Sequence, residues 1–267
     1  MPEGDTVFRA CRQLDQALAG HRLTRAELRV PRFATVDLRG DRVLAVVPRG
    51  KHQLIRLDSG RTLHTHLRMD GVWRVLAGSA SARRLPGPTH QIRVLLGTLG
   101  HTAVGLRLPV VEVLDTAAED TVVGHLGPDL LGLDWDRGEA LRRIGAHPGR
   151  TLGEALLDQR NLAGIGTCYR AEICFLQGVH PRTPVAEVVG LPRLLDRVQQ
   201  LLRVNCSGPR QVTTGNSRRG QRTWVFERPG EPCRRCGTLI AVERFGPAGQ
   251  ERLSYWCPRC QPMGQLT

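Results

Sequence analysis

Lysine is almost missing from this chain of 267 residues, because 37 of its 38 basic residues are arginine and the single lysine is Lys51. A drift of composition toward arginine accounts for the other positions, and chance survival is one explanation of Lys51. The alternative is that this position requires a compact ammonium group that can gain and lose a proton, which a guanidinium group cannot do.

Long apolar runs are also missing. No segment is long and apolar enough to cross a membrane, and the N-terminus lacks the apolar stretch of a secretory signal. We therefore expect a cytoplasmic protein with no membrane partner. The composition, 40% hydrophobic and 24% charged, is typical of a globular protein, and the length suits two domains or one large one.

Acidic residues are too few to balance the basic ones, so the net charge is +13 and the sequence pI is about 10.7. The excess is concentrated, since residues 201–267 carry 11 arginines and four acidic residues. This pattern predicts a polyanionic partner, with nucleic acid ahead of membrane.

The first helix is predicted to begin close to the N-terminus. Asp5 or Thr6 can cap it, and one apolar face follows at helical spacing: Val7, Cys11, Leu14 and Leu18. Pro2 and Glu3 therefore lie just ahead of a helix N-terminus, where the helix dipole disfavours a protonated amine and favours a carboxylate.

Short β-rich runs follow from about residue 22 to 115, and their spacing predicts a sandwich or barrel of antiparallel strands. The runs are RLTRAEL, RVLAVV, HQLIRL, RTLHTHL, GVWRVL, QIRVLL and PVVEVL. Residues 78–89 are predicted to be an exposed loop.

The pattern becomes helical after HLGPDLLGLDW (125–135). The predicted helices are EALRRI, LGEALLDQ, GTCYRAEICFLQ and LPRLLDRVQQLLRV. Residues 205–222 are polar, basic and glycine-containing, which predicts a mobile loop, and a small separate module follows from about residue 223.

Four cysteines in the tail have the spacing C-x2-C-x20-C-x2-C, which predicts a zinc site: Cys233, Cys236, Cys257 and Cys260. Disulfides are the alternative, but they suit a cytoplasmic chain poorly. Four thiolates leave no open position on the metal, so the zinc is expected to be structural and to hold a basic hairpin. The other cysteines are expected to be buried small apolar residues: Cys11, Cys168, Cys174 and Cys206.

Two smaller features allow two interpretations each. Gly164 and Gly166 lie between two apolar helices, where bare backbone N–H groups can bind a phosphate, or where glycine merely permits the turn. His52, His64 and His66 could form a second metal site, but structural or phosphate-facing histidines are the favoured interpretation.

These motifs together resemble the formamidopyrimidine-DNA glycosylase/endonuclease VIII family, nearly from end to end. The matching motifs are P-E-G at the start, R-G-K (49–51), H-L-x-M-x-G (66–71), L-G-P-D-x-L (126–131), L-L-D-Q…A-G-I-G…Y-x-x-E, and R-x-S-x-x-C-P-x-C-Q (252–261). The order and spacing of the motifs make the resemblance specific.

The resemblance implies an α+β multidomain fold. Residues 1–132 would form an N-terminal antiparallel β-sandwich with an N-terminal helix, which carries the catalytic groups. Residues 133–222 would form a helical helix–two-turn–helix domain that binds DNA, and residues 223–267 a zinc-finger β-hairpin.

The resemblance also implies a bifunctional DNA glycosylase/AP lyase of base excision repair. After loss of Met1, the amine of Pro2 would attack C1′ of a damaged nucleotide, and the resulting iminium would permit β,δ-elimination. Glu3 would assist opening of the sugar ring, although the helix dipole opposes its protonation unless it is buried. Lys51 would donate a proton during elimination, and Arg252 would hold the flanking phosphates and assist the second elimination.

Further DNA contacts follow from the same resemblance. Met69 would fill the gap left by the flipped base, with Arg68 beside it, although the sequence alone favours a core methionine. The remaining residues expected to contact DNA are His125, Gly164, Gly166 and Thr167. We expect a monomer that binds damaged duplex DNA at the nucleoid of a bacterial cell.

Some positions depart from the family pattern. Thr6 stands where a glutamate is common, and Thr167 where an asparagine is usual, which predicts weaker DNA contact. The start P-E-G and the lack of an R-x-F wedge in residues 101–114 favour oxidised pyrimidines. Oxidised purines, or a catalytically weak DNA-damage binding protein, are the alternatives.

Overall fold

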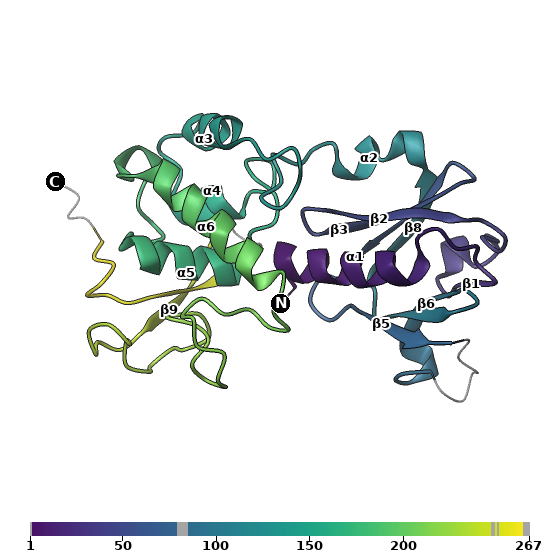
Figure 1. The fold of residues 1–267 in the computed structure, drawn as a ribbon. Helices are drawn as coiled ribbons and strands as arrows, with labels where there is room; N and C mark the ends of the chain where they lie inside the picture. Colours follow the sequence, from purple (N-terminus) through teal and green to yellow (C-terminus); the bar gives the residue numbers. More distant parts are fainter. Residues whose placement is uncertain (1, 79–84, 247–248, 250, 264–267) are drawn as a thin grey trace. The chain divides into compact units, whose positions relative to one another are not determined.

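The structure is a computed structural model that describes residues 2–78, 85–246, 249 and 251–263. The chain divides into two compact units, residues 1–125 and 126–267 (Figure 1). The predicted boundary at residue 132, and the separation of 133–222 from 223–267, stay predictions. Half of the loop predicted at 78–89, residues 79–84, lies outside the described residues.

Two four-stranded antiparallel sheets form the first unit, as the alternating pattern predicts. One sheet has the order β1 (Arg25–Leu28), β6 (Ile92–Gly97), β7 (His101–Leu106) and β5 (Val72–Ala77). The other has the order β2 (Val43–Arg49), β3 (His52–Leu57), β4 (Arg61–His66) and β8 (Val110–Asp115). The region 101–114 therefore contains β8, which the predicted run PVVEVL largely covers, and β7, which is not among the predicted runs.

Helix α1 (Gly4–Leu18) packs against strands of both sheets, β2 and β3 on one side and β5 and β7 on the other (Figure 1). The predicted apolar face is fully buried: Val7, Cys11, Leu14 and Leu18. The predicted cap was wrong. Glu3 occupies the N-cap position, whereas Asp5 lies inside the first turn and accepts a hydrogen bond of 2.9 Å from Arg9.

Short helical segments complete the first unit: η1 (Pro31–Phe33), η3 (Thr89–Gln91), η4 (Thr116–Ala118) and α2 (Asp120–Val123). Glu119, between the last two, accepts hydrogen bonds from Arg56 on β3 (2.6–3.2 Å) and from Thr62 on β4 (2.7 Å). These bonds fasten the end of the sandwich domain to its second sheet.

The second unit contains helices and one hairpin: α3 (Arg137–Gly145), α4 (Leu152–Leu157), α5 (Thr167–Gln177), η5 (Val185–Glu187), α6 (Leu191–Asn205), β9 (Ala241–Phe245) and β10 (Arg252–Trp256). Asp136 and Thr151 cap α3 and α4 through their side chains. Helix α5 is buried because one of its faces packs against the other helices and another face packs against the hairpin. Among the described residues, every helix is too short or too polar to span a lipid bilayer.

Candidate functional site

Pro2 and Glu3 lie at the first turn of α1, in the first unit. The backbone of Glu3 is extended (φ −121°, ψ −173°), and its carbonyl oxygen accepts the N–H of Val7 at 3.0 Å. Glu3 is fully buried, and Pro2 is half-buried. The burial that the sequence could not show is therefore present at Glu3.

Lys51 lies in the tight turn between β2 and β3, after Gly50 in the left-handed region (φ 56°). It is half-buried. Burial, together with the positive charges of Arg68 and Lys51, lowers the pKa of His66 on the neighbouring strand to about 4. The ammonium group of Lys51 is thus close enough to His66 to lower the pKa of its imidazole.

The segment after β4 presents Arg68 and Met69 to solvent. Arg68 has a left-handed backbone (φ 49°), and its N–H donates to Nδ1 of His66 at 2.9 Å. Met69 is 57% exposed, so it is not the core methionine that its residue type favours. His125 is also exposed, and its ring centroid lies 6.3 Å from that of His52.

The turn between α4 and α5 is held together by the side chain of Gln159. Its Nε2 donates to the carbonyl oxygens of Leu157 (2.8 Å) and Ile165 (3.0 Å), and its Oε1 accepts the N–H of Gly164 at 3.1 Å. The backbone at position 164 has a φ of 112°, which residues other than glycine rarely adopt, so this turn requires a glycine there. Gly166 is the N-cap of α5, and both Gly166 and Thr167 are buried.

Beside this turn lies a hollow of about 300 Å³ in the second unit. Four guanidinium groups line it, from Arg150, Arg160, Arg170 and Arg252. Hydrogen bonds from Arg160 and Arg150 hold the pKa of Asp158 well below its ordinary value. With four arginines against the two carboxylates of Glu154 and Asp158, the hollow keeps an excess of positive charge that suits an anion such as a phosphate group.

Arg170 is the one buried member of this set, and it connects α5 to the hairpin. Its Nη2 donates to the carbonyl oxygen of Leu253 at 2.7 Å, next to Arg252 on β10. This bond fixes the start of β10 relative to the helix that follows the Gln159 turn.

The four tail cysteines converge, with all sulfur atoms within 4.8 Å of one another. Sγ of Cys236 lies 3.4 Å from that of Cys257, and Sγ of Cys233 lies 3.9 Å from that of Cys260. Tetrahedral Zn–S bonds of about 2.3 Å require sulfurs roughly 3.8 Å apart, so the residues fit a zinc ion. Among the described residues, the group of ligands that converges closely enough to hold a metal ion is this set of four cysteines.

Comparison with known proteins agrees with this architecture. Residues 1–107 match the formamidopyrimidine-DNA glycosylase N-terminal domain, and residues 230–262 match the zinc finger found in FPG and IleRS. The chain is 56% identical to "Probable endonuclease 8 2" of Streptomyces coelicolor, over 98% of this chain and 94% of that one. The chain belongs to the formamidopyrimidine-DNA glycosylase/endonuclease VIII family. It is also 46% identical to "DNA-(apurinic or apyrimidinic site) lyase Nei2" of Mycolicibacterium smegmatis, over 98% and 99% of the two chains.

A solved structure shares the fold of this endonuclease VIII family member. The complex of Lactococcus lactis Fpg (MutM) with DNA containing N7-benzyl-Fapy-dG has a TM-score of 0.79 at 21% identity, and covers 98% of this chain and 100% of that one. The predicted fold class and the structural zinc are thereby confirmed. The other four cysteines are buried, as predicted: Cys11, Cys168, Cys174 and Cys206.

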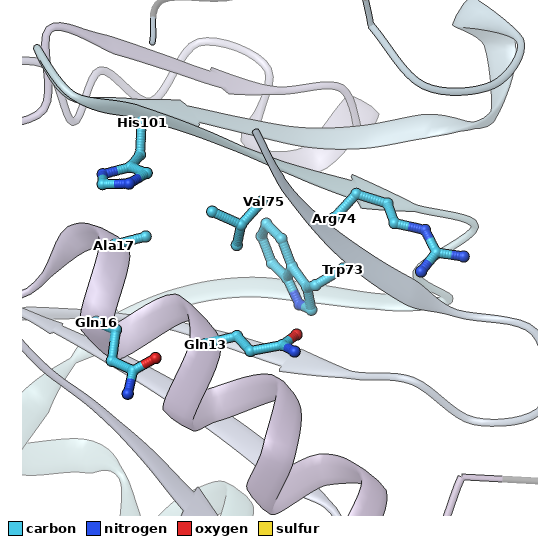
Figure 2. A pocket seen from close by; sticks show the side chains of 7 residues that line it. All are labelled: Gln13, Gln16, Ala17, Trp73, Arg74, Val75 and His101. Atoms are coloured by element: carbon cyan, nitrogen blue, oxygen red, sulfur yellow. The ribbon is translucent and has the colours of Figure 1, made fainter. Parts of the chain in front are cut away.

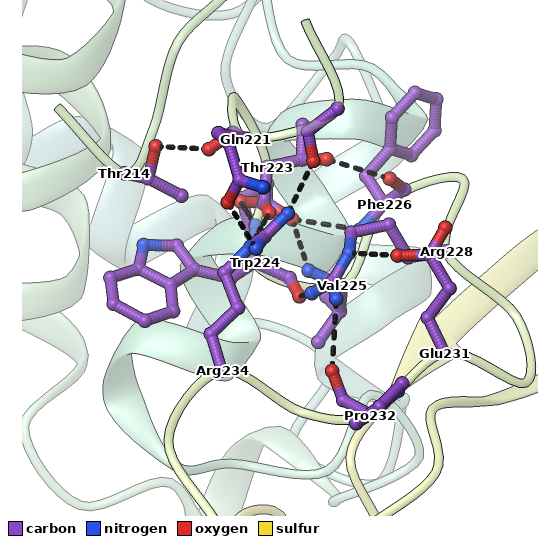
Figure 3. A network of polar contacts seen from close by, with 12 residues as sticks. Thr214, Gln221, Thr223, Trp224, Val225, Phe226, Arg228, Glu231, Pro232 and Arg234 are labelled. Atoms are coloured by element: carbon purple, nitrogen blue, oxygen red, sulfur yellow. Dashed lines mark hydrogen bonds and ion pairs between the residues drawn. The ribbon is translucent and has the colours of Figure 1, made fainter. Parts of the chain in front are cut away.

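Sequence reasoning missed the role of Glu172 in this family member, although the Y-x-x-E motif contains it. Its buried carboxylate accepts the N–H groups of Trp224, Val225 and Phe226 at 2.8–2.9 Å, and the hydroxyl of Thr213. Figure 3 shows residues 223–226 within this network. Glu172 thus anchors both the predicted loop 205–222 and the chain entering the zinc hairpin to α5.

The same network closes the base of that loop. Thr213 N–H donates to the carbonyl oxygen of Arg222 at 2.8 Å, and the hydroxyl of Thr214 donates to the carbonyl oxygen of Gln221 at 2.6 Å (Figure 3). Arg218 and Arg219 lie between these pinned ends and are exposed. The loop therefore exposes the two arginine side chains, while hydrogen bonds at its base fix the two ends of the loop to the rest of the second unit.

A second hollow lies in the first unit, between α1 and β5 (Figure 2). Its lining is mainly polar: Gln13, Gln16, Ala17, Trp73, Arg74, Val75 and His101. None of the predicted site residues lines it. The indole N–H of Trp73 points instead to the interior, where it donates to Gln53 at 3.2 Å.

Proposed function

We propose that this protein is a DNA glycosylase with AP lyase activity, acting in base excision repair on damaged duplex DNA through an amine of Pro2. The observation that carries the proposal is the near full-length identity of 46% to a relative named as a DNA-(apurinic or apyrimidinic site) lyase. The buried Glu3 next to Pro2 supports it, because excluding water from a reaction site strengthens the electrostatic interactions inside it.

The chemistry needs a free secondary amine at residue 2, so Met1 is removed. The amine adds to C1′ and the damaged base leaves with the bonding electrons, and the C1′–O4′ bond then breaks, so that the ring opens and an iminium is left at C1′. The iminium that forms then acidifies the C2′ proton, so the C3′–O bond breaks and the 3′-phosphate departs. Glu3 moves a proton at the ring oxygen, and Lys51 donates one during elimination. A second elimination releases the 5′-phosphate.

Each unit supplies DNA contacts of its own. In the second unit, Arg252 and the arginines around it bind phosphate, and the Gln159 turn with Gly164, Gly166 and Thr167 adds backbone contacts. In the first unit, Met69 enters the space of the flipped base, with Arg68 and His125 on nearby phosphates. An exposed, unbranched apolar side chain suits insertion between base steps. The protein acts as a monomer at the nucleoid.

Oxidised pyrimidines are the proposed lesions, because relatives that are 56% and 46% identical carry the name endonuclease 8. A relative named formamidopyrimidine-DNA glycosylase, from Gluconobacter oxydans, is 32% identical. The purine lesions are therefore the second candidate. Nicking of a panel of duplexes with one lesion each distinguishes the two.

Borohydride trapping on duplex DNA with an AP site tests the proposal. The wild-type protein should form a covalent adduct, and Pro2→Gly should bind the same DNA without trapping. Pro88→Gly, in an exposed turn, is the matched control and should trap normally. Equal trapping by Pro2→Gly would show that Pro2 is not the nucleophile, and binding without any cleavage would identify a damage-binding protein instead.

A further inference from the structure

Three side chains form a continuous hydrogen-bonded row across the second sheet of the first unit. Nδ1 of His52 on β3 lies 2.8 Å from Nε2 of His64 on β4, and Nδ1 of His64 lies 3.0 Å from Oε2 of Glu112 on β8. The His64 and Glu112 positions face one another in the strand register. The row therefore crosses three neighbouring strands.

The two imidazole rings are arranged for proton transfer. Their planes are 20° apart and their centroids 5.1 Å apart, which with the short N···N distance fits a hydrogen bond in the ring plane rather than a stack. An ionised carboxylate only accepts, so His64 carries its proton on Nδ1 and accepts on Nε2. His52 must then donate from Nδ1, and its Nε2 is left unprotonated.

The middle of the row is buried and its outer end reaches water. His64 is buried and His52 is half-buried, whereas the side chain of Glu112 is 37% exposed and can exchange protons with solvent. The inner end lies among the predicted reaction groups. His52 directly follows Lys51, its ring meets His66 edge to face at 4.9 Å, and His125 and Arg68 are the other charged or titratable groups near it.

The surroundings keep the inner end unprotonated. Burial, together with the nearby histidines and the positive charge of Arg68, lowers the pKa of His52 to about 3. His52 is thus neutral at physiological pH, next to an ammonium group at Lys51. An unprotonated group next to a protonated one is the usual arrangement of a catalytic base and acid.

We propose that His52, His64 and Glu112 form a proton relay that takes up the proton released from C2′ during elimination. The inference rests on the proposed lyase function, which leaves the acceptor of this proton unassigned. The C2′–H bond breaks, its electron pair forms the enamine, and the proton joins Nε2 of His52. The Nδ1 proton of His52 passes to His64, and that of His64 passes to Glu112. No buried imidazolium remains, because the proton ends on the partly exposed carboxyl group.

Glu112→Gln tests the relay, because an amide can accept a hydrogen bond from His64 but cannot take its proton. On preformed AP-site duplex under single turnover, the variant should form the borohydride-trapped adduct as fast as wild type, while strand cleavage slows about tenfold. Asp115→Asn, an exposed carboxylate on the same strand, is the matched control and should cleave normally.

The outcomes separate the relay from the proposed function. If wild type traps and cleaves while Glu112→Gln cleaves equally fast, or loses trapping and cleavage together, the relay is refuted and the lyase function stands. If wild type neither traps nor cleaves, both fail. Long-range ¹⁵N NMR adds a readout without DNA: His52 and His64 should both carry the proton on Nδ1, and an Nε2 proton on His64 would overturn the proposal.

Discussion

Replacing Glu172 by glutamine tests the strongest polar anchor in the second unit. Oε1 accepts the N–H groups of Val225 and Phe226, and Oε2 accepts the N–H of Trp224 and the hydroxyl of Thr213. In Glu172→Gln, one oxygen becomes an NH2 group that faces donors. The Thr213 hydroxyl can rotate to accept from it, but at least one backbone N–H loses its acceptor.

A buried donor without an acceptor costs about 1–3 kcal/mol, and bonds to a charged acceptor are stronger than neutral ones. We therefore expect Glu172→Gln to lower the free energy of unfolding of the second unit by about 2–4 kcal/mol. Because Trp224 to Phe226 lead directly into the zinc hairpin, zinc should be released at a lower urea concentration in the same transition.

Urea unfolding followed by tryptophan fluorescence, together with a colorimetric zinc assay, measures both effects. Glu231→Gln is the matched control, since the carboxylate of Glu231 belongs to the same region (Figure 3) but is 56% exposed in its pair with Arg228. The control should change stability by less than about 1 kcal/mol. A change of less than 0.5 kcal/mol in Glu172→Gln, on the order of a surface substitution, would refute the reasoning.

Four further predictions concern acid stability, DNA affinity and zinc. The folded-state pKa of Asp158 lies below its ordinary value of 3.8, so its ion pairs stabilise the second unit at neutral pH and weaken as the pH falls through the folded-state pKa. Asp158→Asn should therefore lower the free energy of unfolding at pH 7 by about 1 kcal/mol and flatten the acid limb of a pH–stability curve. DNA affinity should fall steeply with salt, and Arg252→Ala should reduce the slope of log Kd against log[salt] by about one, whereas an unchanged slope would remove Arg252 from the phosphate contacts. Met69→Ala should leave the melting temperature unchanged and weaken binding to lesion duplex more than to undamaged duplex, because its side chain is exposed. Cys236→Ser should lose zinc and DNA affinity while the first unit stays folded by circular dichroism, and normal DNA binding by the zinc-free variant would show that the hairpin does not hold DNA.

Local sequence signals determined the secondary structure and the metal site of this protein. Alternation of apolar residues placed seven of the eight sandwich strands individually, and a four-residue apolar face placed α1. The two C-x2-C pairs defined the zinc site, because each pair needs only its own tight turn to bring two sulfurs together. The eighth strand, β7, was not among the predicted runs, because HTAVGL (101–106) is buried along nearly its whole length and shows no polar alternation.

Only the tertiary structure decided the contacts between residues that are distant in the chain. The N-cap of α1 is Glu3 rather than Asp5 or Thr6, because packing of the helix against both sheets determines where it begins. Glu172 meets residues 52 to 54 positions later, and His64 meets Glu112 across 48 positions. Such pairs follow from strand register and helix packing, which no local pattern encodes, so the anchor of the zinc hairpin and the histidine relay became visible only in the folded chain.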